Sequence, residues 1–155
     1  VTFHTPLTKE GTFATYHLAS YEAVPGQTKG FFRHLRRSAL IINAARGGVV
    51  DEEALLQAGN PCVIDTWEGE PVIRRELLAK SMLGTYHIAG YTRRGKYNAS
   101  QMVLDAMLHH FGLADIAIPD PPDDAPHIWD IRAVSNQLKA QPARFEYLRE
   151  HYPLR

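Results

Sequence analysis

Arg46, Glu70 and His87 are three ionisable residues whose types and spacing could do chemistry on one substrate. Each follows an apolar run of a length typical of a buried strand. Open α/β sheets place ligand sites at the carboxyl ends of their strands, so we expect the three side chains to share one crevice. An arginine can grip a carboxylate, a histidine can take a hydroxyl proton near neutral pH, and a glutamate can orient that histidine. Oxidation of a 2-hydroxy acid needs these three groups.

The neighbouring residues indicate how each of the three side chains is presented. The glycine pair after Arg46 predicts a tight turn that lets a ligand approach the backbone, and Pro71 holds Glu70 extended. Taken singly, Arg46 could be a surface arginine in a loop and His87 a hydrogen-bonded core histidine. Their occurrence together at successive strand ends favours the catalytic interpretation.

The oxidation also needs an acceptor for hydride, and a nicotinamide cofactor supplies one. Asp65 ends the third predicted strand, and its carboxylate could hydrogen-bond the carboxamide of such a cofactor. A solvated aspartate at a strand end is the alternative for this residue.

Four short apolar runs are predicted to be the strands that position these side chains. They cover residues 1–4, 39–43, 62–65 and 82–86, and they are short enough to be buried on both faces of a sheet. Helices are predicted at residues 29–37, from Asp51 to the stop signal Gly59-Asn60, and at residues 73–80. The alternation of strands and helices predicts an α/β domain with a parallel sheet.

The chain then continues as a long helix and changes composition. Residues 92–111 form a predicted amphipathic helix with Met102, Ala106 and Phe111 among its apolar positions. Residues 118–126 are acidic and rich in proline, which predicts a linker. The tail beyond it has too few apolar side chains to fold alone, so we expect it to dock on the same chain or on a second subunit. These side chains are Trp129, Ile131, Val134, Leu138, Phe145, Tyr147, Leu148 and Tyr152.

The composition argues against several classes of function. Seventeen basic side chains balance seventeen acidic ones in 155 residues, so no net field attracts nucleic acid or an anionic membrane. No apolar run reaches the roughly 18 residues of a membrane span, and we expect a cytoplasmic protein. The single cysteine, Cys62, lies in an apolar run and is predicted to be a buried inert thiol. Because Val1 already lies in a predicted strand, we expect the chain to be part of a longer protein.

Several segments resemble, in order, the signature blocks of the D-isomer-specific 2-hydroxyacid dehydrogenase family. His4–Thr8 is similar to the family's cofactor-side loop. Ile42–Asp51 resembles the block that supplies the carboxylate-binding arginine, and Ile64–Pro71 resembles the block with the catalytic glutamate. His87–Gly90 matches the catalytic histidine block, and the tail around Phe145–Pro153 resembles a C-terminal dimerisation extension found within the family.

The resemblance implies an enzyme that uses NAD, acts on a small phosphorylated 2-hydroxy acid and forms a homodimer through its C-terminal segment. Arg46 would bind the substrate carboxylate, His87 would take the hydroxyl proton, and Glu70 would orient His87 and stabilise its charge. Tyr91 would touch the substrate. The cofactor-binding positions that the resemblance names are Thr5, Ala44, Ala45, Arg46, Asp65 and Gly90.

The resemblance also predicts how the chain divides. Residues 1–91 would be the C-terminal half of a Rossmann-like, doubly wound NAD-binding domain. Residues 92–115 would connect back to a substrate domain, and residues 116–155 would be a linker and the start of a dimerisation domain. The family's Gly-x-Gly-x-x-Gly turn is expected before Val1 and does not occur in these residues. The isolated chain is therefore predicted to be inactive.

The start of the long helix invites a different interpretation. Residues 90–96 fit the first seven positions of a P-loop, but Tyr97 stands where a serine or threonine would hold magnesium. Arg93, Arg94 and Lys96 could instead hold the phosphate of a substrate at the helix N-terminus. A solvated helix face is the alternative for these cations.

Other functions remain open on the sequence. A dehydrogenase acting on glyoxylate or hydroxypyruvate would share the three side chains, although the C-terminal extension argues against it. A binding module that senses NAD would keep the fold and would tolerate His87→Asn, and a truncated product without function is a third possibility. His109 and His110 are adjacent on a helix and therefore diverge, so no metal site is predicted.

Overall fold

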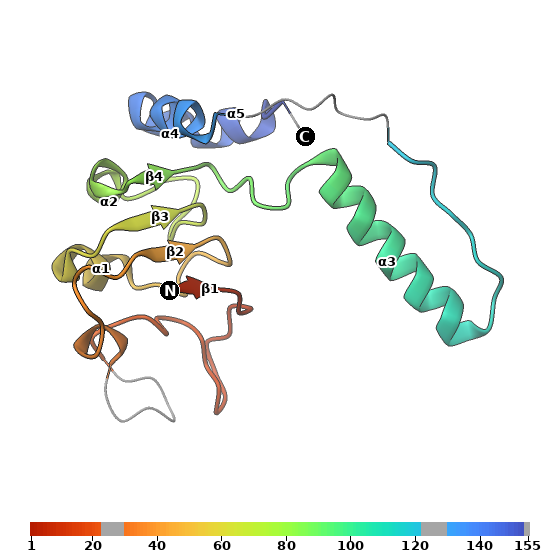
Figure 1. The fold of residues 1–155 in the computed structure, drawn as a ribbon, viewed down its shortest axis with the longest axis horizontal. Helices are drawn as coiled ribbons and strands as arrows, with labels where there is room; N and C mark the ends of the chain where they lie inside the picture. The colour runs from red at the N-terminus through yellow and green to blue at the C-terminus, as the bar shows by residue number, and fades with distance from the viewer. Residues whose placement is uncertain (23–29, 122–129, 154–155) are drawn as a thin grey trace.

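Four short parallel strands organise the computed structural model, which describes residues 1–22, 30–121 and 130–153 (Figure 1). The strands are β1 (Thr2–Phe3), β2 (Ile41–Asn43), β3 (Cys62–Ile64) and β4 (Leu83–Gly84). They lie in the order β1-β2-β3-β4 and every neighbouring pair is parallel. The predicted parallel sheet is confirmed, and each predicted run contains one strand that is shorter than the run.

The helix between β2 and β3 follows its capping signals. Helix α1 (Glu52–Ala58) begins after Asp51, whose carboxylate accepts a hydrogen bond from the Ala54 amide at 3.0 Å. It ends at Gly59, which has a φ of 67° and so adopts the left-handed conformation that glycine favours. Helix α2 (Arg75–Lys80) lies between β3 and β4, within the predicted range 73–80.

The helix predicted at residues 29–37 is wrong for the part that the structure describes. Only a 3-10 turn, η1 (Phe31–Arg33), forms there. The Phe32 amide donates to the Ser20 carbonyl at 3.1 Å, and the Arg33 side chain donates to the Tyr21 carbonyl at 3.0 Å. These tertiary contacts fix the segment as a turn against the loop before it.

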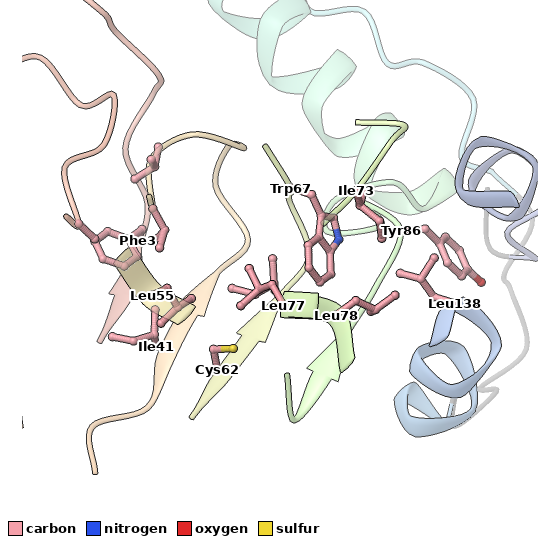
Figure 2. Close-up of a cluster of buried hydrophobic side chains, with 14 of the residues drawn as sticks. Phe3, Ile41, Leu55, Cys62, Trp67, Ile73, Leu77, Leu78, Tyr86 and Leu138 are labelled. Carbon is pink, nitrogen blue, oxygen red and sulfur yellow. The ribbon is translucent and has the colours of Figure 1, made fainter. Parts of the chain in front are cut away.

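The core lies between the sheet and its helices, and Trp67 is its largest fully buried side chain. Figure 2 shows Trp67 beside Ile73 and near Leu78, and its indole nitrogen donates to the Thr85 carbonyl at 2.8 Å. Cys62 is buried and free, and burial raises the pKa of its thiol to about 11. The predicted burial of this thiol is confirmed.

The long helix α3 (Arg93–Phe111) projects away from the sheet (Figure 1). Its Thr92 cap and Gly112 stop confirm the predicted helix. Leu108 is its buried side chain, whereas Met102 and Phe111 are 72% and 65% exposed, so no described residue covers most of its apolar face. Among the described helices, none has the length and apolar character to cross a bilayer.

The tail folds back on the same chain through helices α4 (Ile131–Ala140) and α5 (Phe145–Glu150), joined by the 3-10 turn η2 (Pro142–Arg144). Figure 1 shows α4 and α5 beside β4, at the edge of the sheet. Ser135 accepts a hydrogen bond from the Gly84 amide at 3.0 Å, and Lys139 donates to the Ser81 carbonyl at 2.6 Å. The tail therefore caps an edge strand that would otherwise expose unpaired backbone groups. The predicted linker is described only up to residue 121, and Trp129 lies outside the described residues.

Leu138→Ala tests whether the docked tail is part of the cooperative fold. Leu138 is 0% exposed and reaches toward Leu78 and Tyr86 (Figure 2). Truncation should lower the free energy of unfolding by about 2–5 kcal/mol, measured by urea denaturation, because the cavity lies in a shared core. Ile131→Ala, at a side chain that is 41% exposed, is the control and should cost much less. Equal losses for the two variants would contradict a docked tail.

Candidate active site

The in-register strands bring the loops that follow β2, β3 and β4 to one edge of the sheet. Asn43 pairs with Ile64, and Ile64 pairs with Gly84, so the three strands end side by side. Arg46, Glu70 and His87 lie on the three loops that leave this edge. The shared edge is where open α/β sheets bind their ligands.

His87 and Glu70 form a hydrogen-bonded pair at this edge. The Nδ1 atom of His87 lies 2.8 Å from Oε2 of Glu70, and the two side chains are 24% and 22% exposed. The other carboxylate oxygen of Glu70 accepts a hydrogen bond from the Trp67 amide at 2.7 Å, which holds the carboxylate in place. Because a proton on Nδ1 serves the carboxylate, Nε2 is the ring nitrogen that can exchange a proton with a substrate.

Asp65 holds the backbone of the histidine block. Its carboxylate accepts hydrogen bonds from the Ile88 amide at 2.8 Å and the Ala89 amide at 3.0 Å, and it also binds the Thr85 hydroxyl. Asp65 is 5% exposed, so the alternative of a solvated strand-end aspartate is wrong. These bonds stabilise the turn in which His87 has a φ of 57°, a conformation that costs free energy for a residue with a Cβ.

Arg46 lies on the neighbouring loop, and its side chain is exposed. Its guanidinium donates to the Ala45 carbonyl at 2.7 Å, and within the described residues it makes no hydrogen bond or ion pair with Glu70 or His87. The two glycines after Arg46 were expected to let a ligand approach the backbone. In the structure, glycine is required at position 47 because a Cβ there would collide with the Trp67 carbonyl. The loops that carry Arg46 and Glu70 therefore pack against each other.

Thr5, Ala44, Ala45 and Gly90 are the residues that the sequence predicts to contact a cofactor. The hydroxyl of Thr5 is buried and has no hydrogen-bond partner among the described residues, which is costly unless a ligand supplies one. Gly90 has a φ of 75°, and a Cβ there would meet nothing within 4 Å. Ala44 is exposed and Ala45 is half-buried. Of these residues, Thr5 has the feature that fits a polar group of a ligand, because its buried hydroxyl could bind one.

Arg149 is a site residue that the sequence analysis missed. It belongs to α5, yet its Nε atom donates to the His87 carbonyl at 3.4 Å, across 62 residues of sequence. Its guanidinium carbon lies 4.8 Å from the centre of the Tyr91 ring, and the Lys96 ammonium lies 4.0 Å from the same point. Arg94 instead pairs with Asp120 at 2.8 Å. No sequence signal marks Arg149, because it follows no strand and sits in a charged helical tail.

Glu52 is a buried carboxyl group beneath the loop that carries Glu70. Its Oε1 accepts a hydrogen bond from the Glu68 amide at 2.8 Å, and its Oε2 lies 3.6 Å from Nε of Arg74. Burial raises the pKa of Glu52 to about 7. Despite these neighbouring acids, no group of three His, Cys, Asp or Glu side chains in the described ranges could hold a metal ion.

Glu52→Gln should remove a pH-dependent part of the stability. The pKa of Glu52 is higher in the folded chain, about 7, than its ordinary value of 4.5, so unfolding releases protons between these values and stability falls as pH rises. At about pH 8 the glutamine variant should be more stable than the parent by up to about 3 kcal/mol, and near pH 4 the two should agree. Urea denaturation at both pH values measures this, with Glu53→Gln, at a 57% exposed side chain, as the control. If the difference in the free energy of unfolding between Glu52→Gln and the parent were the same at both pH values, Glu52 would not have the raised pKa.

Comparison with known proteins finds similarity along the whole chain. Residues 1–89 match the family model described as D-isomer specific 2-hydroxyacid dehydrogenase, NAD binding domain. The chain is 43% identical over 173 residues to erythronate-4-phosphate dehydrogenase of Bacteroides thetaiotaomicron, with 100% of this chain and 47% of the relative covered. The enzyme of the same name from Coxiella burnetii is 35% identical over 178 residues, with 100% and 46% covered. The chain thus spans about half the length of the curated relatives it matches.

Two crystal structures are similar in fold. A protein from Thermus thermophilus aligns with a TM-score of 0.50 and 26% identity, over 79% of this chain and 37% of that one. The D-isomer specific 2-hydroxyacid dehydrogenase from Lactobacillus delbrueckii ssp. bulgaricus, solved in its NAD complexed form, aligns with a TM-score of 0.51 and 23% identity. That alignment covers 76% of this chain and 39% of the other, and it supports the fold alone.

Proposed function

Because the chain belongs to the D-isomer-specific 2-hydroxyacid dehydrogenases, we propose that it carries the catalytic loops of an NAD-dependent erythronate-4-phosphate dehydrogenase. The reaction would oxidise 4-phospho-D-erythronate to 2-oxo-3-hydroxy-4-phosphobutanoate, a step in pyridoxal 5'-phosphate biosynthesis. The observation that carries the proposal is the His87 and Glu70 pair at 2.8 Å. The names of the relatives supply the substrate, and the activity is proposed for a protein that contains this chain.

In the proposed reaction, Nε2 of His87 would take the proton of the C2 hydroxyl group, and bound NAD would supply the acceptor for the hydride that leaves C2. The imidazolium that results would lie against the Glu70 carboxylate, which would orient the ring and compensate its charge. The exposed guanidinium of Arg46 would bind the substrate carboxylate and fix C2 near His87. Thr5, Ala44, Ala45, Asp65 and Gly90 are the proposed cofactor contacts.

We propose that Asp65 makes one more contact, with the cofactor. Its two oxygens accept three hydrogen bonds from the protein, and an ionised carboxylate offers about four acceptor sites. A carboxamide N–H could use the remaining one. The role of Asp65 would then be double, to hold the turn of His87 and to orient the cofactor beside it.

The substrate phosphate is proposed to lie near Tyr91. Lys96 and Arg149 both place a positive charge within 5 Å of the centre of its ring, next to the loop of His87. Of the three cations that the sequence offered for phosphate binding, Lys96 is the one whose contact with Tyr91 supports this role. Arg94 is engaged by Asp120.

The domain division and the assembly are also proposals. Residues 1–91 would be half of the NAD-binding domain, residues 92–115 the connection to a substrate domain, and residues 116–155 the start of a dimerisation domain. The exposed apolar face of α3 supports contact with a further domain. Tyr147, 47% exposed on α5, supports a subunit contact through the tail. A cytoplasmic location is proposed from the unpaired Cys62.

A chimeric enzyme tests the proposed activity. In it, this chain replaces the matching segment of the Bacteroides thetaiotaomicron relative, to which it is 43% identical. With 4-phospho-D-erythronate and NAD, the chimera should form NADH, and His87→Asn should lower kcat by about 100-fold or more. His109→Asn, on the exposed side of α3, is the control and should leave kcat unchanged. A folded chimera without turnover, or one indifferent to His87→Asn, would reject the proposal.

Lys96→Gln and Arg149→Gln in the same chimera test the phosphate contact. Each should raise KM for 4-phospho-D-erythronate about tenfold and change kcat less, because a charge-assisted hydrogen bond to the phosphate is lost. Initial rates of NADH formation measure both constants. Arg132→Gln removes an exposed charge elsewhere on the tail and should leave KM unchanged. If Lys96→Gln and Arg149→Gln had the same KM as Arg132→Gln, the phosphate would not bind beside Lys96 and Arg149.

A further inference from the structure

His17 is a half-buried residue that the sequence analysis did not single out. It lies in the segment that follows the cofactor-side loop, and its φ is 52°. Apart from glycines, His17 and His87 are the described residues with a positive φ. Such a backbone costs free energy and persists where surrounding contacts hold it. For His17 the first of these contacts is its own amide, which donates to the Gly48 carbonyl at 2.7 Å, two residues after Arg46.

The side chain of His17 holds the loop that carries Glu70. Its Nε2 atom lies 3.1 Å from both carboxylate oxygens of Glu68. The Tyr16 hydroxyl donates to the same carboxylate at 2.9 Å, and the Tyr16 and His17 rings stack with centres 3.9 Å apart. The stacked side chains of Tyr16 and His17 therefore both bind the Glu68 carboxylate.

The segment around His17 is also tied to the start of α1. Nδ1 of His17 lies 3.7 Å from Asp51, whose carboxylate accepts the Ser20 hydroxyl at 2.7 Å. The Ala19 amide donates to the Val49 carbonyl at 3.1 Å. Residues 17–20 thus run alongside residues 48–51, which continue from the Arg46 turn.

Glu68, which His17 and Tyr16 bind, lies in the same short loop as Glu70, the partner of His87. The Glu68 amide donates to Glu52, and the Trp67 amide donates to the carboxylate of Glu70. Glu70 in turn binds His87. Two glutamates two residues apart are therefore each held by a histidine with a left-handed backbone, Glu68 by His17 and Glu70 by His87.

We propose that His17 is a positioning residue for the proposed dehydrogenase reaction. It touches none of the reacting atoms. Through Gly48 and Glu68 it holds the loops of Arg46 and Glu70 at the spacing that the His87 pair requires. Its effect on turnover rests on the proposed function, whereas its effect on the loop of Glu70 does not.

The first experiment needs no turnover and uses the 155-residue chain. Proton NMR follows the hydrogen-bonded imidazole N–H of His87, and hydrogen exchange follows the Trp67 and Glu68 amides. In His17→Leu the imidazole resonance should be lost, and the two amides should exchange about tenfold faster, because each depends on the fixed loop. His17→Gln, whose amide group can still donate to Glu68, should restore most of the protection. The control His109→Gln should match the parent.

A merely structural role gives a different pattern. If His17 only stabilised the fold, amides throughout the core, such as those of Ile41 and Leu55, would accelerate by the same factor as Trp67 and Glu68. That result, or an unchanged loop and His87 resonance in folded His17→Leu, overturns the proposal. Should His17→Leu fail to fold, Tyr16→Phe decides, because it removes one donor to Glu68. If only the Trp67 and Glu68 amides exchange faster in Tyr16→Phe, the proposal is supported. If their exchange is unchanged, it is overturned.

The second experiment separates this inference from the proposed function. In the chimeric enzyme, His17→Leu should lower kcat about tenfold or more with a smaller change in KM, and His17→Gln should recover most of kcat. A parent chimera that lacks turnover rejects the proposed function and leaves the NMR result standing. An active chimera whose kcat is unaffected by His17→Leu rejects the positioning role alone.

Discussion

The register of β2, β3 and β4 is the constraint on which the candidate site depends. Asn43, Ile64 and Gly84 are paired across the three strands, so the loops beyond them start from one line. A slip of one residue would turn each following side chain to the other face of the sheet. The Asp65 carboxylate, just after β3, holds the His87 turn that follows β4, because it accepts hydrogen bonds from the amides of Ile88 and Ala89. The 2.8 Å distance between His87 and Glu70 follows from strands that end together.

The carboxyl groups of Glu70, Asp65 and Glu52 differ in the groups that they contact. Glu70 has a histidine, Asp65 has backbone amides, and Glu52 has one amide and an arginine 3.6 Å away. Burial dominates at Glu52 and raises its pKa to about 7. The surroundings of Glu52 thus differ from those of Glu70, whose carboxylate is hydrogen-bonded to the His87 ring and the Trp67 amide.

The sequence predicts the elements that depend on local signals and misses those that depend on distant contacts. The strand runs, the helix that begins near Asp51 and its stop at Gly59 could be predicted because each signal acts within a few residues. The 3-10 turn at Phe31–Arg33 was mistaken for a helix because Ser20 supplies its key bond. Arg149 and His17 reach the site across 62 and 51 residues, and neither follows a strand. The three residues chosen from strand ends lie on adjacent loops, yet only Glu70 and His87 are in contact in the described chain.

The docked tail links fold stability to the chemistry of the site. Helices α4 and α5 cover the edge of β4, and the same docking brings Arg149 to the His87 carbonyl and the Tyr91 ring. A cation held there is stabilised further by any anion that binds beside it. On the proposed function, the substrate phosphate would therefore bind the docked state more tightly than an undocked one, and by linkage it would stabilise the docking of the tail. An uncharged end in place of the phosphate would lack this coupling, so the tail becomes part of how the site would distinguish phosphorylated from unphosphorylated 2-hydroxy acids.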